Sequence, residues 1–331
     1  MEEKLICLGI ESTAHTFAIG IVDEEGNILA DVREIYKPTK GWGIIPHEAA
    51  LHHKKIKEEV CRSALEKANL KFKDIDIIAY SCGPGLFPCL KIGAEVASTL
   101  SKKIHKPLIK IHHAIGHIEI GRLLTKAKDP VILLLSGGHN MILAYVEGRY
   151  RVFGEVLDIT CGNLFDTIAR KMGLEMPGGP KIEQLAKLGK NYVELPIAIK
   201  GMDVSFSGIQ TAAINLLKNG VPKEDIAYSL QETCFAALVE TTERAMAHTG
   251  KQECLVTGGV AANRRLREMI SLMCEERGAK AFFVPPEYSG DNAVMIAWVG
   301  LLVYKHCKPL PKIKDRIKPK WRIDEVEITW L

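Results

Sequence analysis

The chain has 331 residues, of which 47% are hydrophobic and 25% are charged. This composition is that of an ordinary globular protein and excludes disordered, collagen-like and coiled-coil chains. Single hydrophobic cores stop growing near this length, so we expect two lobes. The formal net charge of +4 permits a nucleic-acid partner without requiring one.

Cysteine usage and the N-terminus predict the cellular compartment. The nine cysteines form no CxxC pair, and most lie in apolar runs such as Ile6-Cys7-Leu8, so we expect reduced core thiols. The N-terminal Met-Glu-Glu-Lys has no basic signal region or cleavage site behind it. No apolar stretch reaches the roughly 18–20 residues of a membrane span. We therefore expect a cytoplasmic protein with no membrane partner.

The first part of the chain predicts three antiparallel strands followed by alternating helices and strands. Acidic residues before Gly26-Asn27 indicate a hairpin turn between the second and third strands. The predicted strands cover residues 5–10, 17–22, 28–34, 75–80 and 108–111, and the predicted helices cover 48–68, 92–102 and 114–124.

The second part repeats this order. Its predicted strands cover 131–135, 141–146, 150–155, 254–257 and 280–284, and its helices begin near 164 or cover 181–187, 226–249, 263–277 and 293–304. The Gly- and Pro-rich stretch 177–208 is expected to form loops. We expect an N-terminal lobe at 1–128 and a C-terminal lobe at 129–331, with inserted loops at about 173–210.

Glycine-rich turns follow the strands of this second part. Ser136-Gly137-Gly138-His139 lies between two strands, and Gly258–Asn263 leads from a strand into a helix. Glycines allow close backbone approach, and exposed N–H groups at such turns suit a phosphate. A plain hairpin is the alternative for the first turn. Together with Pro177-Gly178-Gly179-Pro180, the turns indicate a nucleotide-like ligand.

His113 and His117 are four residues apart at the start of a predicted helix, so their rings share one face. This spacing suits two imidazoles on one metal, and Asp291 is a candidate oxygen ligand. The alternatives are a capping and a core histidine, with Asp291 as a helix N-cap. Two histidines and one carboxylate suit Fe²⁺, Zn²⁺ or Mn²⁺.

Other histidine and lysine patterns say less about function. His47 and His52 are five residues apart, unlike the four of HExxH, and the His113–His117 pair lacks the Glu of that motif, which argues against a zinc peptidase. No GxSxG motif of a serine hydrolase occurs. Basic residues gather in three clusters, which a solvated surface or a polyphosphate partner would explain. The clusters are Lys54, Lys55 and Lys57; Lys102, Lys103 and Lys106; and Lys308, Lys312, Lys314, Arg316, Lys318, Lys320 and Arg322.

These motifs, in this order, resemble the archaeal and eukaryotic branch of the TsaD/OSGEP/Kae family over nearly the whole chain. The matching segments are Gly9–Thr16, His113–His117, Ser136–Gly138, Pro177–Pro180, Ser205–Gly208, Gly258–Asn263 and Asp291-Asn292. The resemblance implies an α/β actin-like (ASKHA) fold, with duplicated ribonuclease-H-like lobes and a nucleotide cleft between them.

It also implies an acyltransferase that moves threonylcarbamoyl from threonylcarbamoyl-adenylate to N6 of the adenosine beside the anticodon in tRNAs reading ANN codons, releasing AMP. No protein nucleophile is implied. One divalent metal ion, Fe²⁺ with Zn²⁺ or Mn²⁺ as alternatives, would be held by His113, His117 and Asp291. The adenylate would be bound by Leu134, Leu135, Ser136, Gly137, Gly138, Asp166, Gly179, Glu183 and Asn263.

The implied partners are tRNA, a separate synthase that makes the adenylate, and the KEOPS complex. The KEOPS small kinase would be a separate polypeptide, because this chain ends at Leu331.

Four positions depart from the family. Leu134 stands where the archaeal branch usually has a Tyr that binds the metal, and His139 stands where it usually has Asn. Ala293 replaces Gly beside Asp291, and Ile45 replaces His before Pro46.

Two other classes of function remain open. An ATP-dependent small-molecule kinase of the same fold would usually carry Asp where this chain has Glu11. A non-catalytic nucleotide-binding scaffold would bind metal and nucleotide without turnover.

Overall fold

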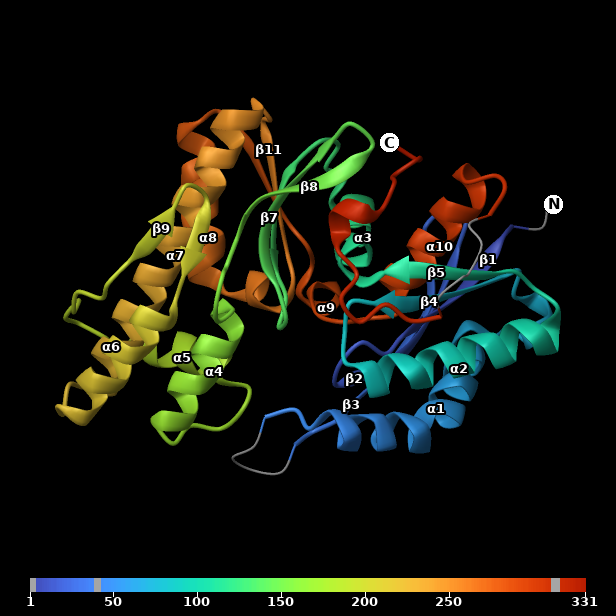
Figure 1. The fold of residues 1–331 in the computed structure, drawn as a ribbon, viewed down its shortest axis with the longest axis horizontal. Helices are drawn as coiled ribbons and strands as arrows, with labels where there is room; N and C mark the ends of the chain where they lie inside the picture. The colour runs from blue at the N-terminus through green and yellow to red at the C-terminus, as the bar shows by residue number, and fades with distance from the viewer. Residues whose placement is uncertain (1–3, 39–42, 311–315) are drawn as a thin grey trace. The chain divides into compact units, whose positions relative to one another are not determined.

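The computed structural model describes residues 4–38, 43–310 and 316–331, and Figure 1 shows their helices and strands. The chain divides into two compact units. The first comprises the described parts of Met1–Leu123, Glu147–Arg149 and Asp291–Leu331, and the second comprises Leu124–Val146 and Tyr150–Gly290.

The first unit is built on a sheet with the strand order β3-β2-β1-β4-β5. β2 pairs antiparallel with β1 and β3, whereas β4 pairs parallel with β1 and β5. Its elements are β1 (Ile6–Glu11), β2 (Thr16–Asp23), β3 (Ile28–Ile35), α1 (Pro46–Ala68), a 3₁₀ turn (Phe72–Asp74), β4 (Ile77–Gly83), α2 (Phe87–Ile104), β5 (Leu108–His112), α3 (His113–Thr125), α10 (Val294–His306) and a 3₁₀ turn (Ile323–Glu325).

The second unit repeats this topology with the order β8-β7-β6-β11-β12. β6 pairs antiparallel with β7, and β11 pairs parallel with β6 and β12, so the predicted duplication is confirmed. Its elements are β6 (Val131–Leu135), β7 (Asn140–Val146), β8 (Arg149–Glu155), α4 (Cys161–Lys171), α5 (Gly178–Ala186), β9 (Ala198–Lys200), β10 (Asp203–Ser205), α6 (Ser207–Lys218), α7 (Lys223–Thr249), β11 (Glu253–Thr257), a 3₁₀ turn (Gly259–Ala262), α8 (Arg264–Glu276), β12 (Lys280–Phe283) and α9 (Pro286–Ser289).

Helices cover both faces of the first sheet. On β1, Leu8 and Ile10 join a core cluster with Val60 of α1. Gly9 lies between them and faces α10, because a Cβ atom at Gly9 would lie 2.4 Å from the backbone nitrogen of Ala297. Since successive strand residues alternate between faces, α10 covers the face opposite to α1 and α2.

This packing explains where the two units divide. We expected residues 291–331 to belong to the C-terminal lobe, but the structure groups the described part of this range with the first unit. The reason is that α10 packs against β1, β2, β4 and β5. The expected boundary at 128 lies close to Leu124, where the second unit begins.

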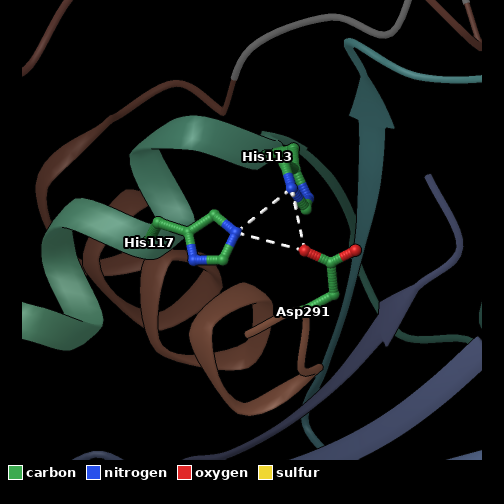
Figure 2. A group of neighbouring side chains, drawn as sticks. All are labelled: His113, His117 and Asp291. Carbon is green, nitrogen blue, oxygen red and sulfur yellow. Dashed lines mark hydrogen bonds and ion pairs between the residues drawn. The ribbon is translucent and has the colours of Figure 1, made fainter. Parts of the chain in front are cut away.

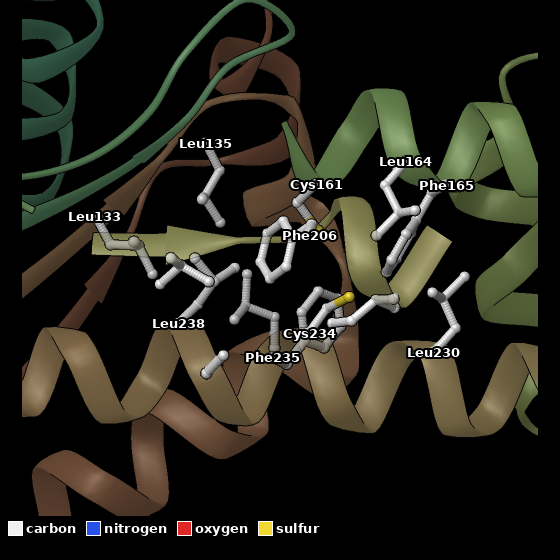
Figure 3. Close-up of a cluster of buried hydrophobic side chains, with 14 of the residues drawn as sticks. Leu133, Leu135, Cys161, Leu164, Phe165, Phe206, Leu230, Cys234, Phe235 and Leu238 are labelled. Carbon is white, nitrogen blue, oxygen red and sulfur yellow. The ribbon is translucent and has the colours of Figure 1, made fainter. Parts of the chain in front are cut away.

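The core of the second unit forms between its sheet and α7 (Figure 3). Leu230, Cys234 and Leu238 of this helix are all buried. They belong to one cluster with Leu133 and Leu135 of β6. Their four-residue spacing places these three side chains on one face of α7, which packs against the sheet.

The predicted helix at 181–187 is present as α5, which begins three residues earlier, but the expectation of loops in the rest of 177–208 is wrong where β9, β10 and the start of α6 occupy it. Glycine and proline do not break α5, because Gly178, Gly179 and Pro180 stand in its first turn, where backbone N–H groups need no intrahelical partner. Likewise, α2 begins at Phe87 with Pro88 in its first turn, five residues before its predicted start.

The thiols agree with the prediction, since all nine cysteines are free and only Cys307 is not fully buried. Among the described residues, no helix is long and apolar enough to span a bilayer.

Candidate functional site

Two histidines and one aspartate meet in the first unit (Figure 2). His113 and His117 lie one turn apart at the start of α3, which follows β5 directly. Asp291 lies just before α10 and points toward both rings. The structure therefore brings together the three predicted metal ligands although 174 residues separate His117 from Asp291.

Close packing fixes this arrangement. A Cβ atom at Gly116 of α3 would lie 3.0 Å from Cγ of Met295, so the small residue permits the approach of α10. The side-chain oxygen of Asn292 accepts a hydrogen bond from the backbone N–H of Met295 at 2.9 Å. Asn292 thus satisfies the helix start, and the alternative role of Asp291 as an N-cap is wrong.

The three ligand atoms lie at mutually similar distances. The Nε2 atoms of His113 and His117 are 3.2 Å apart. Oδ1 of Asp291 is 3.3 Å from Nε2 of His117 and 3.5 Å from Nε2 of His113. Ligands at about 2.1 Å from one ion are about 3.0 Å apart at right angles and about 3.4 Å apart at tetrahedral angles. The donor set therefore fits a single ion.

Glu11, at the end of β1, supports this centre from behind. Its Oε2 lies 2.9 Å from Nδ1 of His113, so this carboxylate accepts the ring N–H and turns Nε2 toward Asp291. Its Oε1 accepts hydrogen bonds from the backbone N–H of Thr13 at 2.6 Å and from the Thr13 hydroxyl at 2.5 Å. A carboxylate behind a ligating histidine is the usual outer partner of a metal site.

The carboxylates make this point favourable for positive charge. Burial disfavours a charged ring, but Glu11 and Asp291 outweigh it and raise the pKa of His113 to about 10. Burial, together with the neighbouring His113, lowers the pKa of His117. Burial alone would raise the pKa of Asp291, but His113 holds it well below its usual value. The negative charges of Glu11 and Asp291 therefore stabilise either a proton on His113 or a metal cation at this point.

Sequence reasoning missed Glu11 and Thr13 as parts of this centre. Glu11 lies in the segment Gly9–Thr16 that resembles the family and differs from the Asp of kinases, but neither pattern gives it a role at the metal. The available signal was a glutamate at the end of an apolar strand, in the small polar turn Glu11–Ala14. No sequence spacing relates it to His113, which lies 102 residues away.

The predicted nucleotide-binding residues lie together in the second unit. A Cβ atom at Gly258 would lie 2.4 Å from the carbonyl carbon of Leu135, so the two glycine turns touch where β6 and β11 end. The carbonyl of Gly137 accepts hydrogen bonds from the Thr160 hydroxyl at 3.0 Å and from the Asn163 amide at 3.1 Å. Both donors belong to the start of α4.

Hydrogen bonds continue this group of contacts through α5 to α8. Oδ1 of Asp166 accepts the backbone N–H of Gly178 at 2.7 Å, which places Gly179 beside α4. Oε1 of Glu183 accepts the backbone N–H of Arg264 at 3.1 Å. Arg264 follows Asn263, the last residue of the Gly258 turn. The expected residues therefore belong to one connected group of contacts.

Several of these side chains already serve the fold. Oδ1 of Asn263 caps α8 by accepting the N–H groups of Arg265 and Leu266. The side chains of Leu134 and Leu135 have no exposed surface, so they can act only by holding the backbone of β6. By contrast, no atom lies within 4 Å of a Cβ built at Gly137, Gly138 or Gly179, which leaves open space there.

The Ser205–Gly208 motif is held by Asp158. This carboxylate accepts the backbone N–H groups of Phe206 and Ser207, each at 2.9 Å, and the hydroxyl of Ser205. Burial would raise the pKa of Asp158, but these hydrogen bonds lower it below its usual range. The motif thus forms the start of α6.

The remaining sequence candidates lie elsewhere. His53 is buried on α1, where its Nε2 donates to the carbonyl of Ala14 at 3.0 Å, so this histidine serves the packing of α1. Lys312 and Lys314 of the basic tail lie outside the described residues.

Comparisons with known proteins identify the family. The sequence model of the family described as "tRNA N6-adenosine threonylcarbamoyltransferase" matches residues 27–298. A protein of that name from Thermococcus kodakarensis is 52% identical over 329 residues, covering 98% of this chain and 100% of that protein. A "probable bifunctional tRNA threonylcarbamoyladenosine biosynthesis protein" from Methanothermobacter thermautotrophicus is 50% identical, covering 99% of this chain and 61% of that protein.

A solved structure shows the fold. HypF from T. kodakarensis matches with a TM-score of 0.61 at 14% identity, over 92% of this chain and 48% of that chain. At this identity the match concerns the fold alone, and it confirms the expected actin-like class. By its family match and its near full-length relatives, the chain belongs to the tRNA N6-adenosine threonylcarbamoyltransferase family.

Proposed function

We propose that this chain transfers the threonylcarbamoyl group from threonylcarbamoyl-adenylate to N6 of the adenosine adjacent to the anticodon in tRNAs reading ANN codons. The observation that carries the proposal is the His113–His117–Asp291 cluster, with Glu11 behind it, in a chain whose full-length relatives bear the transferase name.

The reaction needs no covalent protein intermediate. The N6 amine attacks the carbamoyl carbonyl carbon and a C–N bond forms. The bond from that carbon to the phosphate oxygen breaks, AMP leaves, and the proton lost from N6 passes to solvent. Bound to the cluster, a divalent ion, Fe²⁺ with Zn²⁺ or Mn²⁺ as alternatives, supplies a Lewis acid and a template.

The residues of the chain have distinct roles in this proposal. Glu11 orients the ring of His113, and Asp291 contributes a negative charge to the cluster. The open backbone at Gly137, Gly138 and Gly179 offers N–H groups to the phosphate of the adenylate. Asp166, Glu183 and Asn263 hold these turns in place through their hydrogen bonds.

The partners follow from the same proposal. The chain would use tRNA and an adenylate made by a separate synthase, in the cytoplasm. It would assemble with KEOPS subunits that include a separate small kinase. The greater length of the bifunctional relative supports a link to a second activity of the same pathway.

A small-molecule kinase of the same fold is not favoured. Those enzymes use an Asp at this strand end for Mg-ATP, whereas Glu11 is engaged by His113 and Thr13. The curated relatives bear the transferase name.

The test combines purified full-length protein, its partners, Fe²⁺ under anaerobic conditions, threonylcarbamoyl-adenylate and a tRNA transcript. Mass spectrometry of the digested tRNA should detect threonylcarbamoyladenosine with the wild type and with His306→Ala, a change at an exposed histidine. His117→Ala should give none. Absence of product with the wild type, while the partners are active with another family member, would refute the proposal.

A further inference from the structure

Residues 318–321 of the C-terminal segment cross the ends of β4 and β5 in the first unit, and we call them the strap. The backbone N–H of Lys318 donates to the carbonyl of Cys82 at 2.7 Å, and the N–H of Gly85 donates to the carbonyl of Pro319 at 3.1 Å. A Cβ atom at Gly83 would lie 1.9 Å from the carbonyl oxygen of Lys318, so the strap fits only against glycine. The strap is therefore firmly held.

Trp321 is the last residue of this strap, and two lysine side chains contact its ring. Nζ of Lys318 lies 5.1 Å from the centre of the indole ring, and Nζ of Lys110 on β5 lies 5.5 Å from it. These are cation–π distances, so the ring holds both ammonium groups in place. Lys320 is exposed beside them. We call Lys110, Lys318, Lys320 and Trp321 the lysine–tryptophan surface.

The lysine–tryptophan surface contains a hollow and carries an excess of positive charge. A hollow of about 410 Å³ is lined by Lys318, Pro319, Lys320, Trp321 and Glu325. Among the described residues, no carboxylate lies within ion-pair distance of the three lysines. Glu325 is the acidic group of the lining, against three ammonium groups. A site with this balance favours an anion.

The surface is connected to the metal centre through His112. Nε2 of His112 donates to the carbonyl of Trp321 at 3.1 Å, and Nδ1 accepts the backbone N–H of Ala114 at 3.2 Å. Lys110 and His112 share one face of β5, because strand side chains alternate. His113 follows three residues after Lys110, which places the two Cα atoms within about 10 Å along the strand.

We propose that the lysine–tryptophan surface binds the phosphate backbone of the RNA substrate beside the metal centre. The choice of RNA rests on the proposed function. Prearranged ammonium groups lose little freedom on binding, which favours contacts with successive phosphates. Lys103 over the ring of Phe72 is a similar contact, but the lysine–tryptophan surface joins two such lysines to a hollow.

The experiment measures binding of the full-length protein to a tRNA transcript from 50 to 300 mM KCl. In the triple variant Lys110→Gln, Lys318→Gln and Lys320→Gln, affinity at 0.1 M salt should fall by about tenfold or more, and the slope of log K against log salt should become shallower by about two. The corresponding triple change to arginine keeps the charges and should retain both values.

The matched control changes three exposed lysines of the second unit, Lys171→Gln, Lys187→Gln and Lys218→Gln. It should leave affinity within about twofold of the wild type. Unchanged binding in the test variant, or an equal loss in the control, would overturn the proposal. Equal thermal melting and metal content would confirm that all variants are folded.

Product formation by the wild type is measured in the same preparations. Product together with lysine-independent binding would refute the surface and leave the proposed function standing. Lysine-dependent binding without product would support the surface and refute the function.

Discussion

Replacement of Glu11 by glutamine removes one negative charge behind His113 without changing the size of the side chain. In the wild type, Oε2 accepts the ring N–H of His113, while Oε1 accepts two hydrogen bonds from Thr13. A glutamine has one oxygen and one NH₂ group. In either orientation, the NH₂ group faces the N–H of His113 or that of Thr13, so one bond is lost.

The expected loss can be estimated from this geometry. Glu11 has no exposed surface, so water does not replace the missing acceptor. Loss of a hydrogen-bonded carboxylate behind a metal-binding histidine typically lowers metal affinity by 10- to 100-fold. This corresponds to about 1.4–2.8 kcal/mol. We expect Glu11→Gln to weaken the binding of Zn²⁺, Mn²⁺ and Fe²⁺ within this range.

The assay is competition with a chromophoric chelator, carried out anaerobically for Fe²⁺. Glu66→Gln makes the same change at an exposed position of α1 and should bind metal like the wild type. Thermal melting verifies that both variants are folded. A folded Glu11→Gln protein whose metal affinity is within twofold of the wild type would show that Glu11 does not orient His113.

Three further changes test the packing and the turns. Gly20→Ala would place a Cβ atom 2.3 Å from the backbone nitrogen of Val294, so we expect about 1–3 kcal/mol of destabilisation in urea unfolding, together with weaker metal binding; unchanged values would contradict the close packing of α10. Asn263→Ala removes the cap of α8 and should cost about 1–2 kcal/mol, whereas Asn263→Asp should retain most of it. The lowered pKa of Asp158 stabilises the fold above the ordinary aspartate value of about 3.9, and this contribution is lost as the pH falls through the folded pKa. The stability difference between the wild type and Asp158→Asn should therefore be constant above about pH 5 and shrink below about pH 4, and a difference that persists unchanged at pH 3 would contradict the assignment.

Local patterns predicted the repeated α/β order because strand and helix periodicities are read over short windows. The pair His113 and His117 was visible for the same reason, since both residues share one turn of α3. The two glycine turns were found because each stands at the end of a predicted strand.

Long-range packing lies beyond such patterns. The return of α10 to the first sheet depends on Gly9 and Gly20, which offer room that only the folded sheet reveals. The contact of Glu11 with His113 arises from β1 and β5 ending on either side of β4 in one sheet. Glycine and proline are typical of loops, but Gly178, Gly179 and Pro180 stand in the first turn of α5. There Asp166 accepts the backbone N–H of Gly178, a contact that no local pattern in the sequence predicts.

The most direct test of the metal centre is anomalous diffraction at the absorption edge of the bound metal, from crystals of the full-length protein. The account predicts one peak at about 2.0–2.2 Å from Nε2 of His113, Nε2 of His117 and an oxygen of Asp291. The peak should disappear in His117→Ala crystals. A metal peak elsewhere, with these three side chains unligated, would contradict the account.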